Sequence, residues 1–373
     1  MRTPRVCFVS LHSLGYFVND HGVTGGGAER QLSLLASELA DSFDVRVIVA
    51  DYGQPRQVSR DGVTLHRSYN PDQDSSTTTR LGWLATLART MYRVDADVYV
   101  HRGTPAFAAV VSTLTRALGK PWVYNVANDA NINERPAELG TVRQRLFERG
   151  LQQSAAIITQ TAKQASMVRE RYGREPATVS NGYPRADETA DYNDRAYVLW
   201  VGRLDEAQKR PHLFVDLAET LPETEFRIVG PMGEDEDYHE RLVRRVENLD
   251  NCRYDGAVDP DEIHDYYRSA YCLVSTSAYE GFPNTFLEAW RVGTPVVSLD
   301  VDPARIACAD SLGGFADGEF DRLVDAVSRV ASDETARRRR GEQGREVFET
   351  RFGIAAVAEQ YGEVLRRAAM SDE

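Results

Sequence analysis

The chain of 373 residues contains few lysines and much acid. Only three lysines, Lys120, Lys163 and Lys209, occur among its 44 basic residues, against 57 acidic residues. The formal net charge of −13 argues against general binding of nucleic acid. Scarce lysine beside abundant acid is typical of salt-adapted proteins, whose acidic surface keeps them in solution. A GC-rich genome that encodes arginine in place of lysine would give the same composition.

Cysteines are also scarce, and long apolar runs are absent. Four cysteines, Cys7, Cys252, Cys272 and Cys308, are scattered without metal or redox spacing, so we expect buried thiols. No apolar run approaches the roughly 18 to 20 residues of a membrane-spanning helix. The first such run, Val6–Ser10, is too short for the core of a signal peptide and predicts a strand. We therefore expect a cytoplasmic protein.

Positive charge is concentrated in one part of the sequence. Residues 80–175 contain 14 Lys and Arg against 8 Asp and Glu, a net charge of +6 that leaves −19 for the remainder. This basic block, with the run Arg143–Arg149, could face lipid phosphate or the anionic cytoplasmic face of a membrane. Solvated faces of ordinary helices explain it equally well, so both interpretations remain open.

Length and patterning predict two α/β domains. The chain exceeds the size of a usual single core, and short Val/Ile/Leu-rich runs alternate with helical patterns, as in doubly wound parallel sheets. Asn181–Pro184 and the polar run after it predict a linker. We therefore expect domains over 1–184 and 185–353, followed by a closing amphipathic helix within 354–373. Strands are predicted near 5–10, 45–50, 97–100, 121–126, 155–159, 197–201, 225–229, 252–254, 271–275 and 295–299.

The segment Glu280-Gly-Phe-Pro-Asn-Thr-Phe-Leu-Glu288 places two carboxylates around a helix start that follows an apolar strand. A helix opened by Pro283 leaves its first amides unpaired, where a diphosphate can accept their hydrogen bonds. Glu280 and Glu288 could then hold hydroxyls of a transferred sugar and of a ribose. The alternative is a capped helix with two solvated acids, because the helix dipole favours acids in a first turn anyway.

Two cations follow the predicted strand at 197–201. Arg203 comes directly after Gly202, and Lys209 lies six residues further on. A guanidinium forks onto two oxygens and an ammonium adds a mobile charge, so together they could neutralise a diphosphate leaving group without a metal. A surface loop with solvated charges is the alternative.

Four segments together resemble glycosyltransferase family 4, from Val6 to near Tyr361. They are Gly25–Gln31, Gly202–Lys209, Glu280–Glu288 and Gly293–Val297, and they occur in the order and rough spacing of that family. The resemblance implies a retaining, metal-independent enzyme of the GT-B fold, with two Rossmann-like domains that face a central cleft. The first domain would bind the acceptor and the second the nucleotide sugar.

The resemblance also implies an activity and a set of site residues. A hexose-type sugar would move from a UDP- or GDP-sugar to a glycan or lipid-linked saccharide, in cell-surface or protein glycosylation, without a further cofactor. The catalytic residues would be Glu280, Arg203 and Lys209. The donor would be bound by Gly202, Arg203, Lys209, Val258, Glu280, Gly281, Phe282, Pro283, Asn284, Thr285 and Glu288. The glycine loop of Gly25, Gly26 and Gly27, before a helix over 28–40, would meet the diphosphate and acceptor across the cleft.

One position departs from the family pattern. Many members place a histidine in the loop after the strand at 121–126, but here that loop reads Asn125-Val-Ala-Asn128-Asp129. Asn128 or Asp129 would then orient the sugar or the acceptor. His101, at the end of the preceding strand, is a further candidate on the acceptor side, although a lone histidine there is more often structural.

Other functions remain open. A sugar-nucleotide 2-epimerase of the same fold needs an acid/base set that we do not locate, and a non-catalytic sugar-nucleotide binder would keep Arg203 and Lys209. A Rossmann dehydrogenase is disfavoured, because Gly25–Gly27 lie about fifteen residues past the first strand and Arg30 occupies the third glycine position. Asp-x-Asp triplets occur at 95–97, 235–237 and 300–302, but in separate elements, so no metal is predicted.

Overall fold

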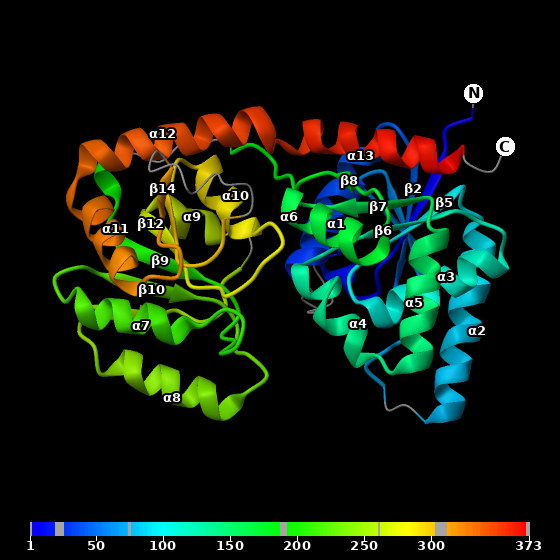
Figure 1. Cartoon of the computed structure of the whole chain (residues 1–373), viewed down its shortest axis with the longest axis horizontal. Coiled ribbons are helices and arrows are strands. Elements are labelled where there is room, and N and C mark those ends of the chain that lie inside the picture. Colours follow the sequence, from blue (N-terminus) through cyan, green and yellow to red (C-terminus); the bar gives the residue numbers. More distant parts are fainter. Residues whose placement is uncertain are drawn as a thin grey trace. The chain divides into compact units, whose positions relative to one another are not determined.

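The chain forms two compact units (Figure 1). The computed structural model describes residues 2–18, 26–73, 76–186, 192–259, 262–302 and 312–370. Unit 1 comprises Met1–Pro184 and Ile354–Glu373, and unit 2 comprises Arg185–Gly353. Each unit is built around one sheet that has helices packed against it.

The sheet of unit 1 has the strand order β3-β4-β2-β1-β5-β6-β7-β8. Among the strands that the structure describes in this unit, β3 and β4 pair antiparallel and the other neighbours pair parallel. The strands are β1 (Arg5–Val9), β2 (Asp44–Val49), β3 (Gln57–Arg60), β4 (Val63–Arg67), β5 (Val98–Arg102), β6 (Trp122–Asn125), β7 (Ala156–Thr159) and β8 (Ala177–Thr178). The helices are η1 (Leu11–Tyr16), α1 (Gly27–Leu39), α2 (Thr77–Val94), α3 (Pro105–Ala117), η3 (Asp129–Asn131), α4 (Glu134–Glu138), α5 (Thr141–Gln153), α6 (Ala162–Tyr172) and α13 (Ile354–Ala369).

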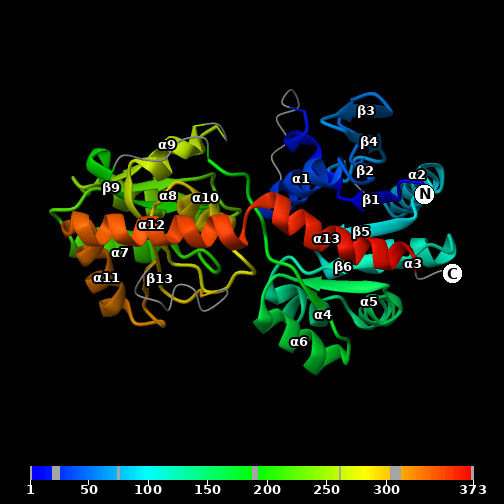
Figure 2. The same cartoon turned by 90° about the horizontal axis from the view of Figure 1, so that it is seen from above.

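The core of unit 1 has two layers because successive side chains of a strand point to opposite faces. In β1, Val6 and Phe8 join a cluster with α1 and α13, whereas Cys7 and Val9 join a cluster with α2, α3 and α5. Figure 2 shows the closing helix α13 lying along the strands β5 and β6 of this unit. Its buried Tyr361 contacts Phe8, with ring centroids 6.4 Å apart.

The sheet of unit 2 is entirely parallel, in the order β11-β10-β9-β12-β13-β14. The strands are β9 (Tyr197–Val201), β10 (Phe226–Val229), β11 (Cys252–Tyr254), β12 (Ala270–Ser275), β13 (Val296–Ser298) and β14 (Gly313–Phe315). The helices are η4 (Tyr192–Asp194), α7 (Pro211–Thr220), α8 (Glu236–Glu247), α9 (Ile263–Arg268), α10 (Asn284–Arg291), α11 (Phe320–Ser332) and α12 (Glu334–Arg351). Helices α7, α8 and α11 form the main core with the strands.

Both sheets reverse their direction of growth at one point. In unit 2 the chain runs outward from β9 through β10 to β11, then returns to the other side of β9 as β12. In unit 1 the same reversal lies between β1 and β5. The crevice at the carboxyl ends of such strands is the usual ligand position in open α/β sheets. The topology therefore marks one candidate position in each unit.

The structure confirms the α/β class and all ten predicted strands, each to within two residues at either end. The predicted first helix, 28–40, runs instead from Gly27 to Leu39. Cys7, Cys252 and Cys272 are buried free thiols as expected, and Cys308 lies outside the described residues. None of the helices in the described ranges combines the length and apolarity that a bilayer crossing requires.

Candidate functional site

The loops after β9 and β12, residues 202–210 and 276–283, lie together at the reversal point of the second sheet. Hydrogen bonds join them. Ala278 N donates to the Gln208 carbonyl at 2.8 Å, and Gln208 Nε2 donates to the Tyr279 carbonyl at 3.2 Å. The Thr276 hydroxyl donates to the Lys209 carbonyl at 2.7 Å. The backbone of Lys209 is therefore fixed against the loop that carries Glu280.

Lys209 and Glu280 form an ion pair between these loops. Only 25% of the lysine side chain and 13% of the glutamate side chain are exposed. An ammonium has three donors and a carboxylate about four acceptor positions, so the paired groups retain capacity for a phosphate oxygen and a sugar hydroxyl. Two residues predicted separately from the sequence are thus brought together, with an ammonium beside a carboxylate.

Arg203 is placed differently. Its side chain is 51% exposed, and its nearest ionic contact is to Asp205 at 3.7 Å. The loop starts at a fixed point, because the Gly202 amide donates to the Val229 carbonyl at 3.0 Å. Gly230 packs so closely that a Cβ there would lie 1.8 Å from the Gly202 carbonyl oxygen. Arg203 therefore extends from an ordered backbone and is held only loosely, which suits a side chain that turns onto a ligand.

Helix α10 begins at Asn284, and Pro283 precedes it with φ −65°. Glu288 lies one turn further, where its Oε2 accepts a hydrogen bond from the hydroxyl of the fully buried Tyr267 at 2.8 Å. Phe282 is buried against Phe352, with ring centroids 4.9 Å apart. The side chain of Phe282 therefore serves the core, and only its backbone could reach a donor.

A buried chain of polar contacts supports Glu288 from behind. Arg195 donates to the Thr294 hydroxyl at 2.8 Å, and that hydroxyl donates to the Tyr267 carbonyl at 2.7 Å. Gly293, beside Thr294, has φ +74°, and a Cβ there would lie 2.6 Å from the Tyr192 hydroxyl. The Gly-Thr-Pro segment of the sequence is thus a structural support. Arg195 and Tyr267 were missed because single residues outside a motif carry no sequence signal.

The remaining donor-side candidates are backbone positions. Gly281 is buried, and Asn284 and Thr285 form the start of α10, where a helix presents its amides. Val258 is half-buried in the loop after β11. That loop is joined to the one after β10, because the Gly230 amide donates to the Gly256 carbonyl at 2.8 Å.

In unit 1, the glycine loop meets the start of α1. Gly25 lies outside the described residues. Gly26 precedes the helix, and its amide donates to Glu29 Oε2 at 2.9 Å. Gly27 is the first helical residue. A phosphate at this helix start would have to compete with the Glu29 carboxylate for the Gly26 amide.

The acceptor-side candidates make contacts within unit 1. His101 is 4% exposed, and its Nδ1 lies 3.0 Å from the Val9 carbonyl, which accepts its proton. Burial lowers the pKa of His101, so the ring is neutral at physiological pH. The Asn128 side chain accepts from Asn131 N at 3.1 Å and caps η3. Through these bonds, His101 and Asn128 stabilise the loops at the carboxyl edge of the sheet.

Asp129, the third acceptor-side candidate, is 9% exposed. One carboxylate oxygen accepts from Gln164 Nε2 at 3.1 Å, and the other pairs with Lys163 Nζ at 2.7 Å. Its carboxylate therefore fastens the loop after β6 to helix α6.

The Asp-x-Asp triplets are also engaged within the protein. Asp95 pairs with Lys120 at 2.7 Å, Asp235 caps α8 through Tyr238 N at 2.9 Å, and Asp300 pairs with Arg210. Across the described ranges, no three His, Cys, Asp or Glu side chains are grouped so as to hold a metal ion. That the reaction needs no metal stays a prediction.

Comparisons with known proteins fit this geometry. Residues 26–182 match the family model described as glycosyl transferase 4-like domain, and residues 186–347 match glycosyl transferases group 1. A phosphatidyl-myo-inositol mannosyltransferase of Mycobacterium leprae is 30% identical over 198 residues, which cover 51% of this chain and 49% of the relative. The chain spans about half the length of the curated relatives that it matches first.

Solved structures resemble the whole chain. A sucrose-phosphate synthase from Thermosynechococcus elongatus has a TM-score of 0.80 at 17% identity, covering 98% of this chain and 99% of that one. Anabaena HepE in complex with UDP and glucose has a TM-score of 0.75 at 16% identity, covering 97% and 99%. At these identities the likeness shows the fold, which is that of GT-B glycosyltransferases.

Proposed function

Because this chain belongs to the group 1 glycosyl transferases of family 4, we propose that it is a retaining glycosyltransferase that uses a UDP- or GDP-hexose. The observation that carries the proposal is the Lys209–Glu280 ion pair at the reversal point of the second sheet. The HepE structure with UDP and glucose supports the donor class. The name of the mycobacterial relative, a phosphatidyl-myo-inositol mannosyltransferase, supports a lipid-linked acceptor; that this acceptor is a glycan or lipid-linked saccharide is part of the proposal.

In this proposal the residues of unit 2 stabilise the leaving group. The bond from the anomeric carbon to the phosphate oxygen breaks, and negative charge grows on the diphosphate. Lys209 and Arg203, with the amides at the start of α10, stabilise that charge without a metal. Glu280 hydrogen-bonds a hydroxyl of the sugar and positions its anomeric carbon, while Glu288 holds the ribose.

The acceptor hydroxyl attacks the anomeric carbon on the face that the diphosphate leaves, so the anomeric configuration is retained. Its proton passes to the departing phosphate oxygen. No protein nucleophile is required, in keeping with a site whose carboxylate is held in an ion pair with Lys209.

The proposal includes peripheral contact with the cytoplasmic membrane face through residues 80–175. Helices α2 and α3 contain no acidic residue, although the chain has 57. Exposed Leu81 and Leu84 on α2, and Val142 and Leu146 on α5, add apolar side chains to the arginines of these helices. Co-sedimentation with phosphatidylglycerol vesicles, and not with phosphatidylcholine vesicles, is the expected result. If the protein binds neither kind of vesicle, or binds both kinds equally, this part of the proposal is wrong.

A thermal-shift screen tests the donor class. UDP- and GDP-sugars are compared with UDP, GDP and NAD at high and low salt. One nucleotide series should raise the melting temperature, because a ligand that binds the folded state stabilises it. Assays of linkage to saccharide acceptors then separate a transferase from a non-catalytic binder. No shift with either series would contradict the proposal.

Changing Glu288 to alanine is expected to lower affinity for the nucleotide roughly tenfold, because the ribose loses a charged hydrogen-bond partner. Tyr267→Phe, which removes only the hydroxyl that holds Glu288, should lower it roughly threefold. Calorimetry with UDP and GDP measures both, and Arg322→Ala on the exposed side of α11 is the control. Unchanged affinity in Glu288→Ala would contradict the ribose role.

A further inference from the structure

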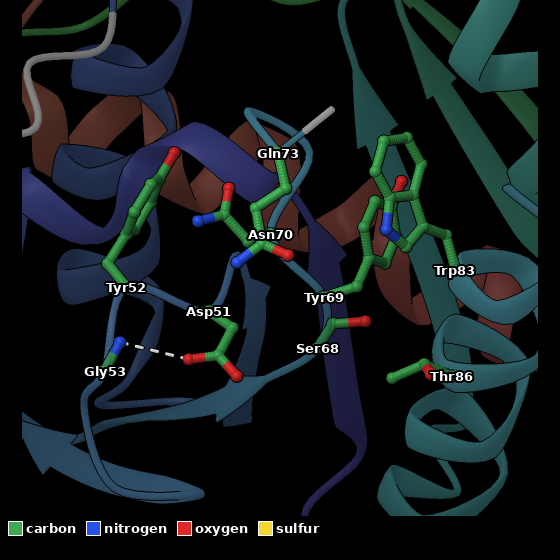
Figure 3. A pocket seen from close by; sticks show the side chains of 9 residues that line it. All are labelled: Asp51, Tyr52, Gly53, Ser68, Tyr69, Asn70, Gln73, Trp83 and Thr86. Atoms are coloured by element: carbon green, nitrogen blue, oxygen red, sulfur yellow. Dashed lines mark hydrogen bonds between the residues drawn. The ribbon is translucent and has the colours of Figure 1, made fainter. Parts of the chain in front are cut away.

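A pocket lies wholly within unit 1, at the carboxyl ends of β2 and β4 and beside α2 (Figure 3). Its volume is about 760 Å³. Asp51 and Tyr52 come from the loop after β2, Ser68 and Tyr69 from the segment after β4, and Trp83 from α2. None of these residues was identified from the sequence. Because β2 and β4 follow β1 in the sheet, the pocket lies on the same carboxyl edge as the reversal point between β1 and β5.

The lining is polar and aromatic. Asp51, Ser68, Asn70, Gln73 and Thr86 supply carboxylate, amide and hydroxyl groups. Among the described residues that line it there is no lysine or arginine, and no aliphatic side chain. A phosphate or nucleotide would lack a cationic partner in the lining, because the nearby Arg67 is already paired with Asp51 at 3.4 Å, and a lipid chain would lack an apolar wall. This composition suits a neutral ligand that is rich in hydroxyls.

One wall is aromatic. The rings of Tyr69 and Trp83 stack with centroids 5.2 Å apart and planes inclined by 15°. In Figure 3 this pair lies to one side of the pocket, Tyr52 lies to the other, and Asn70 and Gln73 lie between them. The faces of aromatic rings are negative, so they attract the weakly positive C–H groups of a sugar ring. The arrangement offers a flat surface for such a ring and amides for its hydroxyls.

Ser68 is a buried lining residue whose hydroxyl lacks a hydrogen-bond partner among the described residues. It is 7% exposed, and its hydroxyl has no hydrogen-bond partner in the part of the chain that the structure describes. A buried polar group without a partner is costly and uncommon. The neighbouring groups are satisfied: Tyr52 donates to Asp72 at 2.8 Å, and Asp51 accepts from Gly53 N at 3.0 Å. The oxygen atom itself is buried, so a ligand hydroxyl would supply the missing bond after the Ser68 side chain rotates toward the pocket.

We propose that the pocket binds a neutral sugar ring of the acceptor glycan, next to the sugar unit that receives the transferred residue. This rests on the proposed function. Neighbouring strands lie about 4.8 Å apart, so β2 is one strand and β4 two strands away from β1. A chain of linked sugars that reaches the reversal point would extend into this pocket. The protein thereby selects an acceptor by a sugar that does not react.

Tryptophan fluorescence offers a direct test. Trp122, Trp200 and Trp290 are at most 3% exposed, so Trp83 is the tryptophan that a pocket ligand would contact. Titration of the whole protein with maltose, cellobiose, lactose and mannobiose should change its emission for at least one of them. UDP and glucose 6-phosphate serve as charged probes and should not give this change in the pocket.

Two serine variants separate binding from folding. Ser68→Ala should lower saccharide affinity roughly fivefold, the loss of one neutral hydrogen bond, without lowering the melting temperature. Ser112→Ala is the matched control, because Ser112 is equally buried but donates to the Ala109 carbonyl at 3.1 Å. It should lower the melting temperature slightly and leave affinity unchanged. Trp83→Ala, followed by calorimetry, should lower affinity roughly tenfold.

The outcomes distinguish this inference from the proposed function. No response to any neutral disaccharide, with nucleotide stabilisation intact, overturns the pocket and leaves the transferase. Equal affinity in wild type, Ser68→Ala and Trp83→Ala places the binding elsewhere and also overturns it. A third outcome is that saccharide binding depends on Ser68 and Trp83 but the protein binds no nucleotide. The pocket would then still bind a sugar, but its acceptor role and the proposed function would both be wrong.

Discussion

Lys209→Ala is expected to lower the turnover number by about a hundredfold or more. Loss of one preorganised donor to a developing anion typically has an effect of this size. Here the change also removes the ionic partner of Glu280, whose side chain is only 13% exposed. A carboxylate without its counter-charge would repel the departing diphosphate. The two effects act in the same direction on the chemical step.

Arg203→Ala should also lower turnover by about a hundredfold, through a single effect. The arginine is half exposed, and its contact is to Asp205 at 3.7 Å, so its removal leaves no buried charge. Lys209→Ala should therefore lower turnover at least as much as Arg203→Ala.

Turnover is measured with a donor from the stabilising nucleotide series, beside the exposed control Arg322→Ala, and the melting temperature of each variant shows that the fold is kept. Near-normal turnover in both Lys209→Ala and Arg203→Ala would contradict the catalytic role proposed for these two residues. A loss that appears only in KM would instead mean that the cations serve binding equally in the ground and transition states.

Much of this fold could be predicted because central parallel strands are buried on both faces. Such strands appear as short Val/Ile/Leu-rich runs, as β1, β9 and β12 do. The missed strand β3 is mostly exposed, and its sequence Gln-Val-Ser-Arg is polar. The missed β14 reads Gly-Gly-Phe, since a Cβ on Gly313 would lie 1.9 Å from the Val296 carbonyl oxygen. Glycine is required there by close strand approach, and it carries no strand signal.

The sequence marked Lys209 and Glu280 as candidates, but it could not predict that the two side chains pair. Lys209 and Glu280 are 71 positions apart in the chain, and their pairing depends on β9 and β12 being neighbours. Strand order is a property of the whole sheet, and local patterns do not contain it. For the acceptor-side candidates the position along the chain was predicted, but the role of the side chain was not. Asn128 lies at a strand end as expected, but asparagine is also favoured at helix caps, which is where the structure uses it.

Arg195→Ala is expected to lower the free energy of unfolding of unit 2 by about 3 to 5 kcal/mol. Arg195 is 5% exposed and donates to the Gly293 carbonyl, the Ala270 carbonyl and the Thr294 hydroxyl. Its guanidinium also lies 4.6 Å from the ring centroid of Tyr192. Burial lowers the pKa of Arg195 to about 10, so it stays protonated at neutral pH. Alanine removes the donor from three buried acceptors and leaves a void beside the ring.

Arg195→Lys tests whether geometry or charge matters. Lysine keeps the charge but lacks the planar fork that bonds several acceptors at once, so an intermediate loss of stability is expected. A two-unit chain need not unfold in one transition, so urea unfolding is combined with hydrogen exchange read by mass spectrometry. Peptides from β9, β12 and β13 should lose protection, while those of unit 1 keep theirs. Arg322→Ala should change stability by no more than about 0.5 kcal/mol.

The same variant connects stability to function. Arg195 bonds Thr294, Thr294 bonds Tyr267, and Tyr267 holds Glu288. Arg195→Ala should therefore weaken nucleotide binding even at temperatures where unit 2 remains folded, and to about the same extent as Tyr267→Phe. Full nucleotide affinity in a destabilised Arg195→Ala protein would show that the polar chain supports the fold alone. A loss of stability below about 1 kcal/mol would mean that water replaces the guanidinium, and that the Gly-Thr-Pro segment holds its place without it.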